Sequence, residues 1–178
     1  PLQHEQLADY VKRMAEKVDA AEEFYLLGYS FGGFIVQEIH LLKPAKKTVI
    51  LGSIRSHLEK PPLIKMGELT RLPKILPQRF YNQSSVLYKR FKWFFDPDNP
   101  KLVEYFRVRD PYYLKWSVEK IAEWKFDALP GVIQILGEKD IVFPPKYSKP
   151  DYIIKNGSHL FPATKHREVS LLLKKIFV

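Results

Sequence analysis

The sequence predicts an α/β protein: a mostly parallel sheet with flanking helices and a helical insertion between its strands. Short apolar runs alternate along the chain with segments whose apolar residues recur every three or four positions. This alternation is typical of strands joined by helices. Between the second and third apolar runs lies a long stretch that is rich in prolines and aromatic residues. Because prolines break regular elements, this stretch is expected to be an insertion rather than part of the sheet.

Residues 1–54 are predicted to form the first part of the sheet core. Helical spacing of apolar residues over 7–18 predicts a first helix, and the apolar run 24–27 predicts a buried strand. Helical spacing resumes over 32–43 and stops at a proline. The β-branched run 48–52 then predicts a second buried strand.

Residues 55–127 form the predicted insertion, which is helical, basic and rich in aromatic residues. Helices are expected over 84–95, 100–108 and 111–124, because each segment begins near a serine or proline. Fourteen of the 25 Phe, Trp and Tyr residues of the chain lie between positions 80 and 126. Since aromatic side chains bury readily, most of them are expected to form the core of the insertion itself.

Residues 128–178 return to the pattern of a sheet. Apolar runs over 132–137 and 152–154 predict two further strands. A closing helix is predicted because one of its faces would carry Val169, Leu172, Leu173 and Ile176. Only eleven residues separate Asp140 from the last strand, and three of them are prolines. We therefore expect an extended connection without a helix. Parallel crossovers normally take a dozen or more residues, so the direction of the last strand stays open at this point.

Composition narrows the function classes. The chain has 178 residues, of which 46% are hydrophobic and 28% charged, as in an ordinary globular domain. It contains no cysteine, which excludes disulfides, thiol catalysis and thiolate metal sites. No pair of histidines has the spacing of metal ligands, so no metal site is expected. No apolar run is long enough to span a membrane, and no basic segment followed by an apolar one opens the chain, so we expect a cytoplasmic location.

The positive charge is concentrated in the insertion. Of the formal net charge of +9, residues 55–125 supply +7, with fifteen Lys or Arg against eight Asp or Glu. The sharpest patch, residues 89–93, interleaves aromatic residues with cations. Such a surface suits an anionic polymer or surface, and it also suits a solvated helix face. Because no recognised nucleic-acid motif accompanies the patch, we expect no nucleic-acid partner.

The most informative motif is the G-x-S-x-G sequence with Ser30 at its centre, placed between a predicted strand and a predicted helix. A turn of this kind holds the serine in a strained backbone conformation and exposes its hydroxyl above the sheet edge. Gly28 and Gly32 are expected to be required, because side chains there would collide as the helix folds back over the strand. The N–H of Phe31 faces the same space and is a candidate oxyanion donor. The alternative is a glycine-rich turn in which Ser30 only caps the helix.

A serine nucleophile needs an oriented base, and two residues stand where a base and its acid are required. Asp140 follows the predicted strand 132–137, and His159 follows the predicted strand 152–154. Because the carboxyl ends of parallel strands meet at one edge of a sheet, we expect Asp140 and His159 to approach Ser30 there.

Other acids and histidines compete for these roles. For the acid, Glu138 lies beside Asp140, and Glu59 follows the second strand. Among the histidines, His57 also follows the second strand and is interpreted as part of a surface loop. Three others fall within or beside predicted helices: His4, His40 and His166.

The segments 28–33, 137–140 and 157–159 resemble the three signatures of the α/β-hydrolase superfamily. The resemblance implies a partial α/β-hydrolase fold whose helical cap shapes specificity, with a nucleophile elbow flanked by Gly28 and Gly32. It also implies acyl-enzyme chemistry on esters, thioesters, amides or lactones, without a cofactor. By this resemblance Ser30 attacks the substrate and His159 moves the proton. Asp140 orients the imidazole, and the Phe31 N–H holds the oxyanion.

One departure from the family pattern concerns the oxyanion hole. In the family, a second donor comes from a loop after an early strand, often marked by a His-Gly pair. No His-Gly pair occurs in this sequence, and no strand is predicted before the first helix. We therefore expect this chain to lack the N-terminal strands of the family together with that loop.

Three functions remain at this stage. The leading hypothesis is a serine hydrolase that cleaves a small carboxylic ester or thioester, with a small-molecule acyl substrate as its partner. The alternative is an α/β-hydrolase-fold protein that binds a ligand or partner without turning it over. The third is a binding module whose basic insertion engages an anionic polymer or surface. Reactivity of Ser30 separates the first from the other two.

Overall fold

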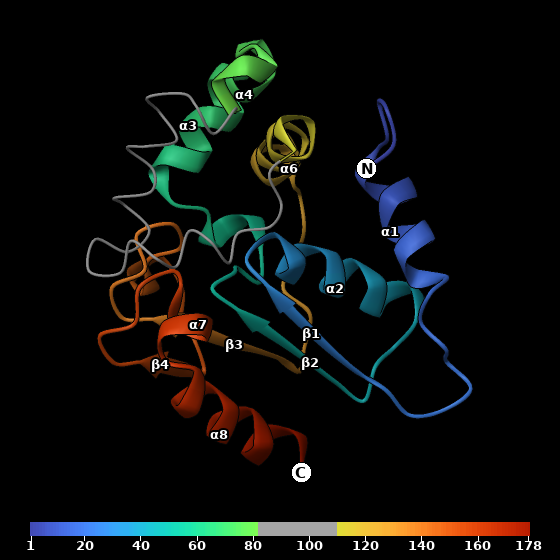
Figure 1. Cartoon of the computed structure of the whole chain (residues 1–178), viewed down its shortest axis with the longest axis vertical. Coiled ribbons are helices and arrows are strands. Elements are labelled where there is room, and N and C mark those ends of the chain that lie inside the picture. The colour runs from blue at the N-terminus through green and yellow to red at the C-terminus, as the bar shows by residue number, and fades with distance from the viewer. Residues whose placement is uncertain (82–109) are drawn as a thin grey trace.

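The computed structural model describes residues 1–81 and 110–178 of the chain (Figure 1). Within these residues the strands form a parallel sheet in the order β1-β2-β3-β4. The predicted fold class, an α/β protein with a mostly parallel sheet and flanking helices, is therefore confirmed. The strands are β1 (Tyr25–Tyr29), β2 (Lys47–Leu51), β3 (Val132–Gly137) and β4 (Tyr152–Ile154).

Helices lie on both faces of the sheet and beyond one of its ends. In Figure 1, α1 and α2 lie on one side of the sheet, α7 and α8 on the other, and α3, α4 and α6 beyond the carboxyl ends of the strands. None of these helices is long and apolar enough to cross a bilayer. The helices expected over 84–95 and 100–108, and the patch 89–93, fall outside the described residues. The helices are α1 (Leu7–Ala15), α2 (Phe31–Leu42), α3 (Pro62–Thr70), α4 (Leu72–Ile75), α6 (Pro111–Glu123), α7 (Phe161–Thr164) and α8 (His166–Phe177), with 3₁₀ turns η1 (His57–Glu59), η2 (Gln78–Tyr81) and η4 (Pro145–Tyr147).

The central strand β2 is buried on both faces, which is why Val49, Ile50 and Leu51 follow one another without a polar residue between them. Its side chains alternate between two hydrophobic clusters. Ile50 packs in the cluster that contains Phe34 of α2. Val49 and Leu51 pack in the second cluster, together with Val169 of α8. The two clusters hold α2 and α8 on opposite faces of the sheet.

The strand β1 differs from its prediction as a buried strand. Leu26 and Gly28 are buried, whereas Tyr25 and Leu27 are 41% and 46% exposed. The reason is topological, because β1 is the outermost strand at one edge of the sheet formed by the described residues. An apolar run shows that a strand is hydrophobic, and it carries no information about the place of that strand in the sheet.

The last strand, whose direction the sequence left open, runs parallel to β3. As expected, its connection from β3 contains no α-helix, although it includes the 3₁₀ turn η4. Asp151 holds the start of β4 beside β3. Its carboxylate accepts the N–H of Gln134 at 2.8 Å, and its own N–H donates to the carbonyl oxygen of Gln134 at 3.0 Å.

Of the seven described aromatic residues of the insertion, Trp116, Trp124 and Phe126 are buried, and they pack in the cluster that contains Phe34 of α2 rather than in a separate core of the insertion. Trp116 of α6 is 4% exposed and Trp124 is 3% exposed. Trp124 packs edge-on against Phe34 of α2, with ring centroids 4.5 Å apart. Its Nε1 donates to Oε1 of Glu38, also in α2, at 2.8 Å. The insertion is thus packed firmly onto the helix that follows β1.

This contact makes the stability of the protein sensitive to pH at Glu38. Burial raises the pKa of Glu38 above its ordinary value of 4.5. Between 4.5 and the raised pKa, the folded protein holds a proton that the unfolded chain has released, so stability falls as pH rises through that interval. Glu38→Gln keeps an oxygen that accepts the Trp124 bond but cannot ionise. We expect its thermal midpoint to exceed that of the wild type at neutral pH and to match it at about pH 4.

The control for this prediction is Glu22→Gln, which removes a carboxylate from an exposed position before β1. Its thermal midpoint should follow that of the wild type at both pH values. Equal differences between Glu38→Gln and the wild type at neutral and acid pH would contradict the argument.

Candidate active site

Ser30 lies on a sharp turn between β1 and α2. Its backbone angles are φ 51° and ψ −121°, a left-handed φ that an L-residue rarely adopts and that costs about 1–3 kcal/mol. Two backbone hydrogen bonds hold the turn. The N–H of Ser30 donates to the carbonyl of Leu51 in β2 at 2.9 Å, and the Ser30 carbonyl accepts the N–H of Gly33 at 2.9 Å. The strained turn is therefore anchored to the neighbouring strand on one side and to the new helix on the other.

The predicted collision of a side chain with the neighbouring backbone occurs at Gly28, and the prediction is wrong for Gly32. A Cβ atom at Gly28 would lie 2.3 Å from the carbonyl oxygen of Gly32, because β1 and α2 touch backbone to backbone there. A Cβ atom at Gly32 would have no atom within 4 Å, since this position faces away from the strand. The second tight position is instead Gly33, where a Cβ atom would lie 2.4 Å from Cβ of Ser53.

The structure brings Ser30, His159 and Asp140 together in a chain of hydrogen bonds. Nδ1 of His159 lies 2.8 Å from Oδ2 of Asp140, and Nε2 of His159 lies 3.0 Å from Oγ of Ser30. Because an ionised carboxylate can only accept, Nδ1 carries the hydrogen, and Nε2 accepts from the serine hydroxyl. His159 is 3% exposed and Asp140 is 2% exposed, whereas Ser30 is partly accessible.

The loops that carry Asp140 and His159 are bonded to each other. The N–H of Lys139 donates to the carbonyl of Gly157 at 2.8 Å, and the other Asp140 oxygen, Oδ1, accepts two N–H groups of its own loop, at 2.8 and 2.9 Å. Gly137 at the end of β3 permits this contact, because a Cβ atom there would lie 2.4 Å from the Gly157 carbonyl oxygen. The acid loop and the base loop therefore form one unit at the carboxyl ends of β3 and β4.

The competing acids have other partners. The Glu138 carboxylate accepts the N–H of Asn156 at 2.7 Å, which adds another link between the same two loops. The Glu59 carboxylate accepts the N–H of Arg55 and an amide hydrogen of Gln134, each at 2.9 Å.

Two of the competing histidines, His40 and His57, have contacts elsewhere. Nδ1 of His40 lies 3.0 Å from Oγ1 of Thr48, and Nδ1 of His57 lies 2.8 Å from the carbonyl of Phe126. These contacts place both rings outside the Ser30 turn.

Two aromatic rings flank the His159 imidazole, and sequence reasoning missed both. The Tyr29 ring centroid lies 5.4 Å from that of His159, and the Phe143 ring centroid lies 5.9 Å from it. Gly52, at the end of β2, has a φ of +52° and leaves room for the rings, because a Cβ atom there would lie 3.3 Å from atoms of both Tyr29 and His159. Tyr29 occupies a variable position of the G-x-S-x-G motif, so the motif gave no indication that its side chain contacts His159.

Phe31 begins α2 directly after Ser30. Its N–H belongs to the first turn of the helix, where backbone N–H groups have no carbonyl of the same helix to bond. Its side chain points away from solvent and packs edge-on against Trp116 of α6, with ring centroids 5.6 Å apart. The insertion therefore lies directly over the residue that follows Ser30.

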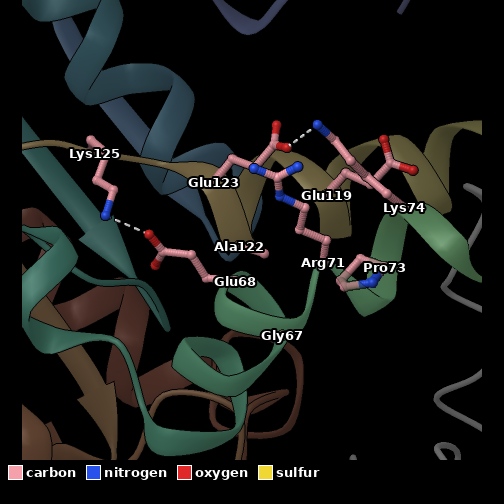
Figure 2. A pocket seen from close by; sticks show the side chains of 9 residues that line it. All are labelled: Gly67, Glu68, Arg71, Pro73, Lys74, Glu119, Ala122, Glu123 and Lys125. Carbon is pink, nitrogen blue, oxygen red and sulfur yellow. Dashed lines mark ion pairs between the residues drawn. The ribbon is translucent and has the colours of Figure 1, made fainter.

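A cavity of about 410 Å³ lies elsewhere, between α3, α4 and α6 (Figure 2). Its lining is charged, and ion pairs join Lys74 to Glu123 and Lys125 to Glu68 across it. The Glu68 carboxylate also binds the ammonium group of Lys60, whose pKa is lowered by burial. None of Ser30, Asp140 and His159 lines this cavity, and we assign it no part in their chemistry. Within the described residues there is no cluster of three or more potential metal ligands.

Comparison with solved structures places this arrangement in a known fold. An esterase described as thermophilic, from Thermogutta terrifontis, is 14% identical, with a TM-score of 0.67 over 96% of this chain and 70% of that one. A 2-hydroxy-6-oxo-6-phenylhexa-2,4-dienoate hydrolase from a Rhodococcus species is 17% identical, with a TM-score of 0.65 over 99% and 74%. A lipase-esterase related protein from Clostridium acetobutylicum is 16% identical, with a TM-score of 0.64 over 96% and 75%. The chain has a partial α/β-hydrolase fold.

The expected resemblance to the α/β-hydrolase fold is thus confirmed at the level of structure. No family model and no curated protein matches the sequence. The similarity to α/β-hydrolases therefore rests on the arrangement of strands and helices, and the function of the chain depends on the residues of its site.

The contact between β1 and α2 predicts different outcomes for two glycines of one motif. Gly28→Ala places a methyl group against the backbone of α2, which can yield only by moving the helix. We expect it to destabilise the protein by about 3 kcal/mol or more. Gly32→Ala, the matched control, puts a methyl group into open space and should change stability by less than about 0.5 kcal/mol. Urea unfolding followed by circular dichroism measures both, and equal losses for the two variants would refute the contact.

Proposed function

We propose that the chain is a serine hydrolase that cleaves a small carboxylic ester or thioester through an acyl-enzyme intermediate. The observation that carries this proposal is the chain of hydrogen bonds from Ser30 through His159 to Asp140, at 3.0 and 2.8 Å, on a turn whose backbone is strained. A serine that only capped α2 would require neither the strain nor the buried imidazole. The side chain of Ser30 makes no capping hydrogen bond to α2.

In the proposed reaction, Oγ of Ser30 attacks the substrate carbonyl carbon while Nε2 of His159 takes the hydroxyl proton. The tetrahedral intermediate then collapses, the bond to the leaving oxygen or sulfur breaks, and His159 returns the proton to that atom. Water repeats the same steps on the acyl-enzyme and releases the carboxylic acid. The starting geometry needs no rearrangement, because the hydroxyl already donates to Nε2.

Asp140 has the role of orienting His159 and stabilising its charged form. One carboxylate oxygen binds Nδ1, and the other accepts the N–H groups of Val142 and Phe143. These bonds fix the carboxylate, so it holds the imidazole in one tautomer with Nε2 towards Ser30.

The oxyanion is assigned to the N–H of Phe31, at the N-terminus of α2. The partial positive charge of a helix N-terminus favours the negative oxygen of the tetrahedral intermediate. One donor of this kind is worth about 10²–10³-fold in rate. Because α6 packs over Phe31, we also assign the insertion, residues 55–127, the role of a cap that shapes the acyl site.

The substrate class draws support from what the structural neighbours are. They include an esterase, a lipase-esterase related protein and a hydrolase of a dienoate. Two of these proteins are named as hydrolytic enzymes, and the third is named as related to lipases and esterases.

Covalent labelling tests the proposal directly. We expect a fluorophosphonate probe to label the wild-type chain and to leave Ser30→Ala unlabelled, because only an activated hydroxyl attacks phosphorus at a useful rate. Ser148→Ala, at a partly accessible serine in the loop before β4, is the control and should label normally. A folded wild-type chain that does not label would overturn the hydrolase proposal and leave the binding protein as the function of the fold.

Replacing Asp140 and Glu138 in turn shows which of the two carboxylates acts on His159. Asp140→Asn places an amide opposite Nδ1 and favours the wrong imidazole tautomer, so we expect the labelling rate to fall by about 10³–10⁴-fold. Glu138→Gln, two residues earlier and exposed, should change the rate by less than about threefold. Rate constants from gel-based labelling time courses measure both effects. A comparable loss in Glu138→Gln would contradict the assignment of Asp140 as the acid.

A further inference from the structure

Tyr29 contacts the backbone of the residue that is proposed as the base. It is the last residue of β1, directly before Ser30, and its hydroxyl donates to the main-chain carbonyl of His159 at 3.0 Å. The contact joins positions that are 130 residues apart in the chain. It therefore ties the strand that carries the nucleophile to the loop that carries the base.

The same side chain also supports the ring of His159. The Tyr29 and His159 rings lie 5.4 Å apart with an angle of 33° between their planes, and Gly52 leaves the space that both occupy. Asp140 holds the imidazole ring at Nδ1. The Tyr29 hydroxyl holds the backbone end. Together the two contacts restrain both the position of the residue and the rotation of its ring.

The hydroxyl is suited to a constant donor role. Burial raises the pKa of Tyr29 above its ordinary value, and the negative charge of Asp140 raises it further. The phenol therefore keeps its proton throughout the neutral range. A carbonyl oxygen accepts this proton with the same geometry whether the imidazole is neutral or charged, so the contact persists through a catalytic cycle.

We propose that Tyr29 is a positioning residue that holds the His159 backbone so that Nε2 stays within hydrogen-bond reach of Ser30. This inference rests on the proposed hydrolase function. Its physical basis is that the distance between Nε2 and Oγ depends on two elements that approach from different parts of the chain, β1 and the loop after β4. A small displacement of a reacting group can cost an enzyme up to about 10²-fold in rate.

Tyr29→Phe tests the proposal, because it keeps the ring beside His159 and removes only the donor. We expect the rate constant for fluorophosphonate labelling, and kcat for a short ester, to fall about tenfold, with KM unchanged. Tyr25→Phe is the matched control, since it removes a hydroxyl from the same strand at a residue that packs against Phe177 of α8. It should leave the rate unchanged. A Tyr29→Phe variant as reactive as the wild type would overturn the inference while the hydrolase proposal stands.

A double-mutant cycle with His159→Ala distinguishes positioning from a general structural effect. If Tyr29 acts through His159, Tyr29→Phe has no further effect on the residual labelling of His159→Ala. An equal tenfold loss in both backgrounds would overturn the inference, because the hydroxyl would then act on something other than the base.

Proton NMR provides a readout that does not depend on activity. The Nδ1–H of His159 should give a downfield signal in the wild type that shifts or broadens in Tyr29→Phe and persists in Tyr25→Phe. If the wild type does not label at all, the hydrolase proposal fails. The NMR comparison alone then decides whether Tyr29 holds His159, and an unchanged signal in Tyr29→Phe would refute it.

Discussion

The candidate site depends on the absence of a side chain between β1 and α2. With no Cβ atom at Gly28, the backbone of α2 descends onto the strand, and the chain must reverse within the residues that follow. Ser30 takes the strained conformation that this reversal demands. The energy cost is offset by the packing of Phe34 and its neighbours, which holds α2 against the sheet. The packing of α2 against the sheet, through the contact at Gly28, therefore fixes the direction of the Ser30 hydroxyl.

The second half of the site is assembled from two loops that bond mainly to each other. Asp140 and His159 follow different strands, yet their loops share backbone hydrogen bonds, and Gly137 allows the close approach. The unit meets the Ser30 turn at the Ser30 hydroxyl and at the hydroxyl and ring of Tyr29. The alignment of nucleophile and base is therefore a matter of how one preformed unit docks onto another.

Much of the fold and of the site was predictable because it depends on local patterns. Ser30 could be found because its motif lies between an apolar run and a helical one, and Asp140 and His159 because each directly follows a strand. The parallel direction of β4 stayed open because its connection is shorter than a usual crossover. The bonds of Asp151 to Gln134, seventeen residues earlier, leave no trace in a local pattern. Tyr29 escaped notice for a related reason. Its identity matters only through a carbonyl at the other end of the chain, and no local spacing records such a partner.

The bonding between the acid and base loops has a consequence for protein engineering. Residues 134–159 form a cassette: the end of β3, the acid, the connection, β4 and the base. Its acid and base loops are joined by contacts within the segment, and its connection is also bonded to Arg55. Exchanging only Asp140 or only His159 into another scaffold would leave these contacts behind. A graft that moves the whole cassette carries the contacts between the acid and base loops. The recipient has to supply a strand in place of β2, an arginine in place of Arg55, and a suitably turned serine with a tyrosine one residue before it.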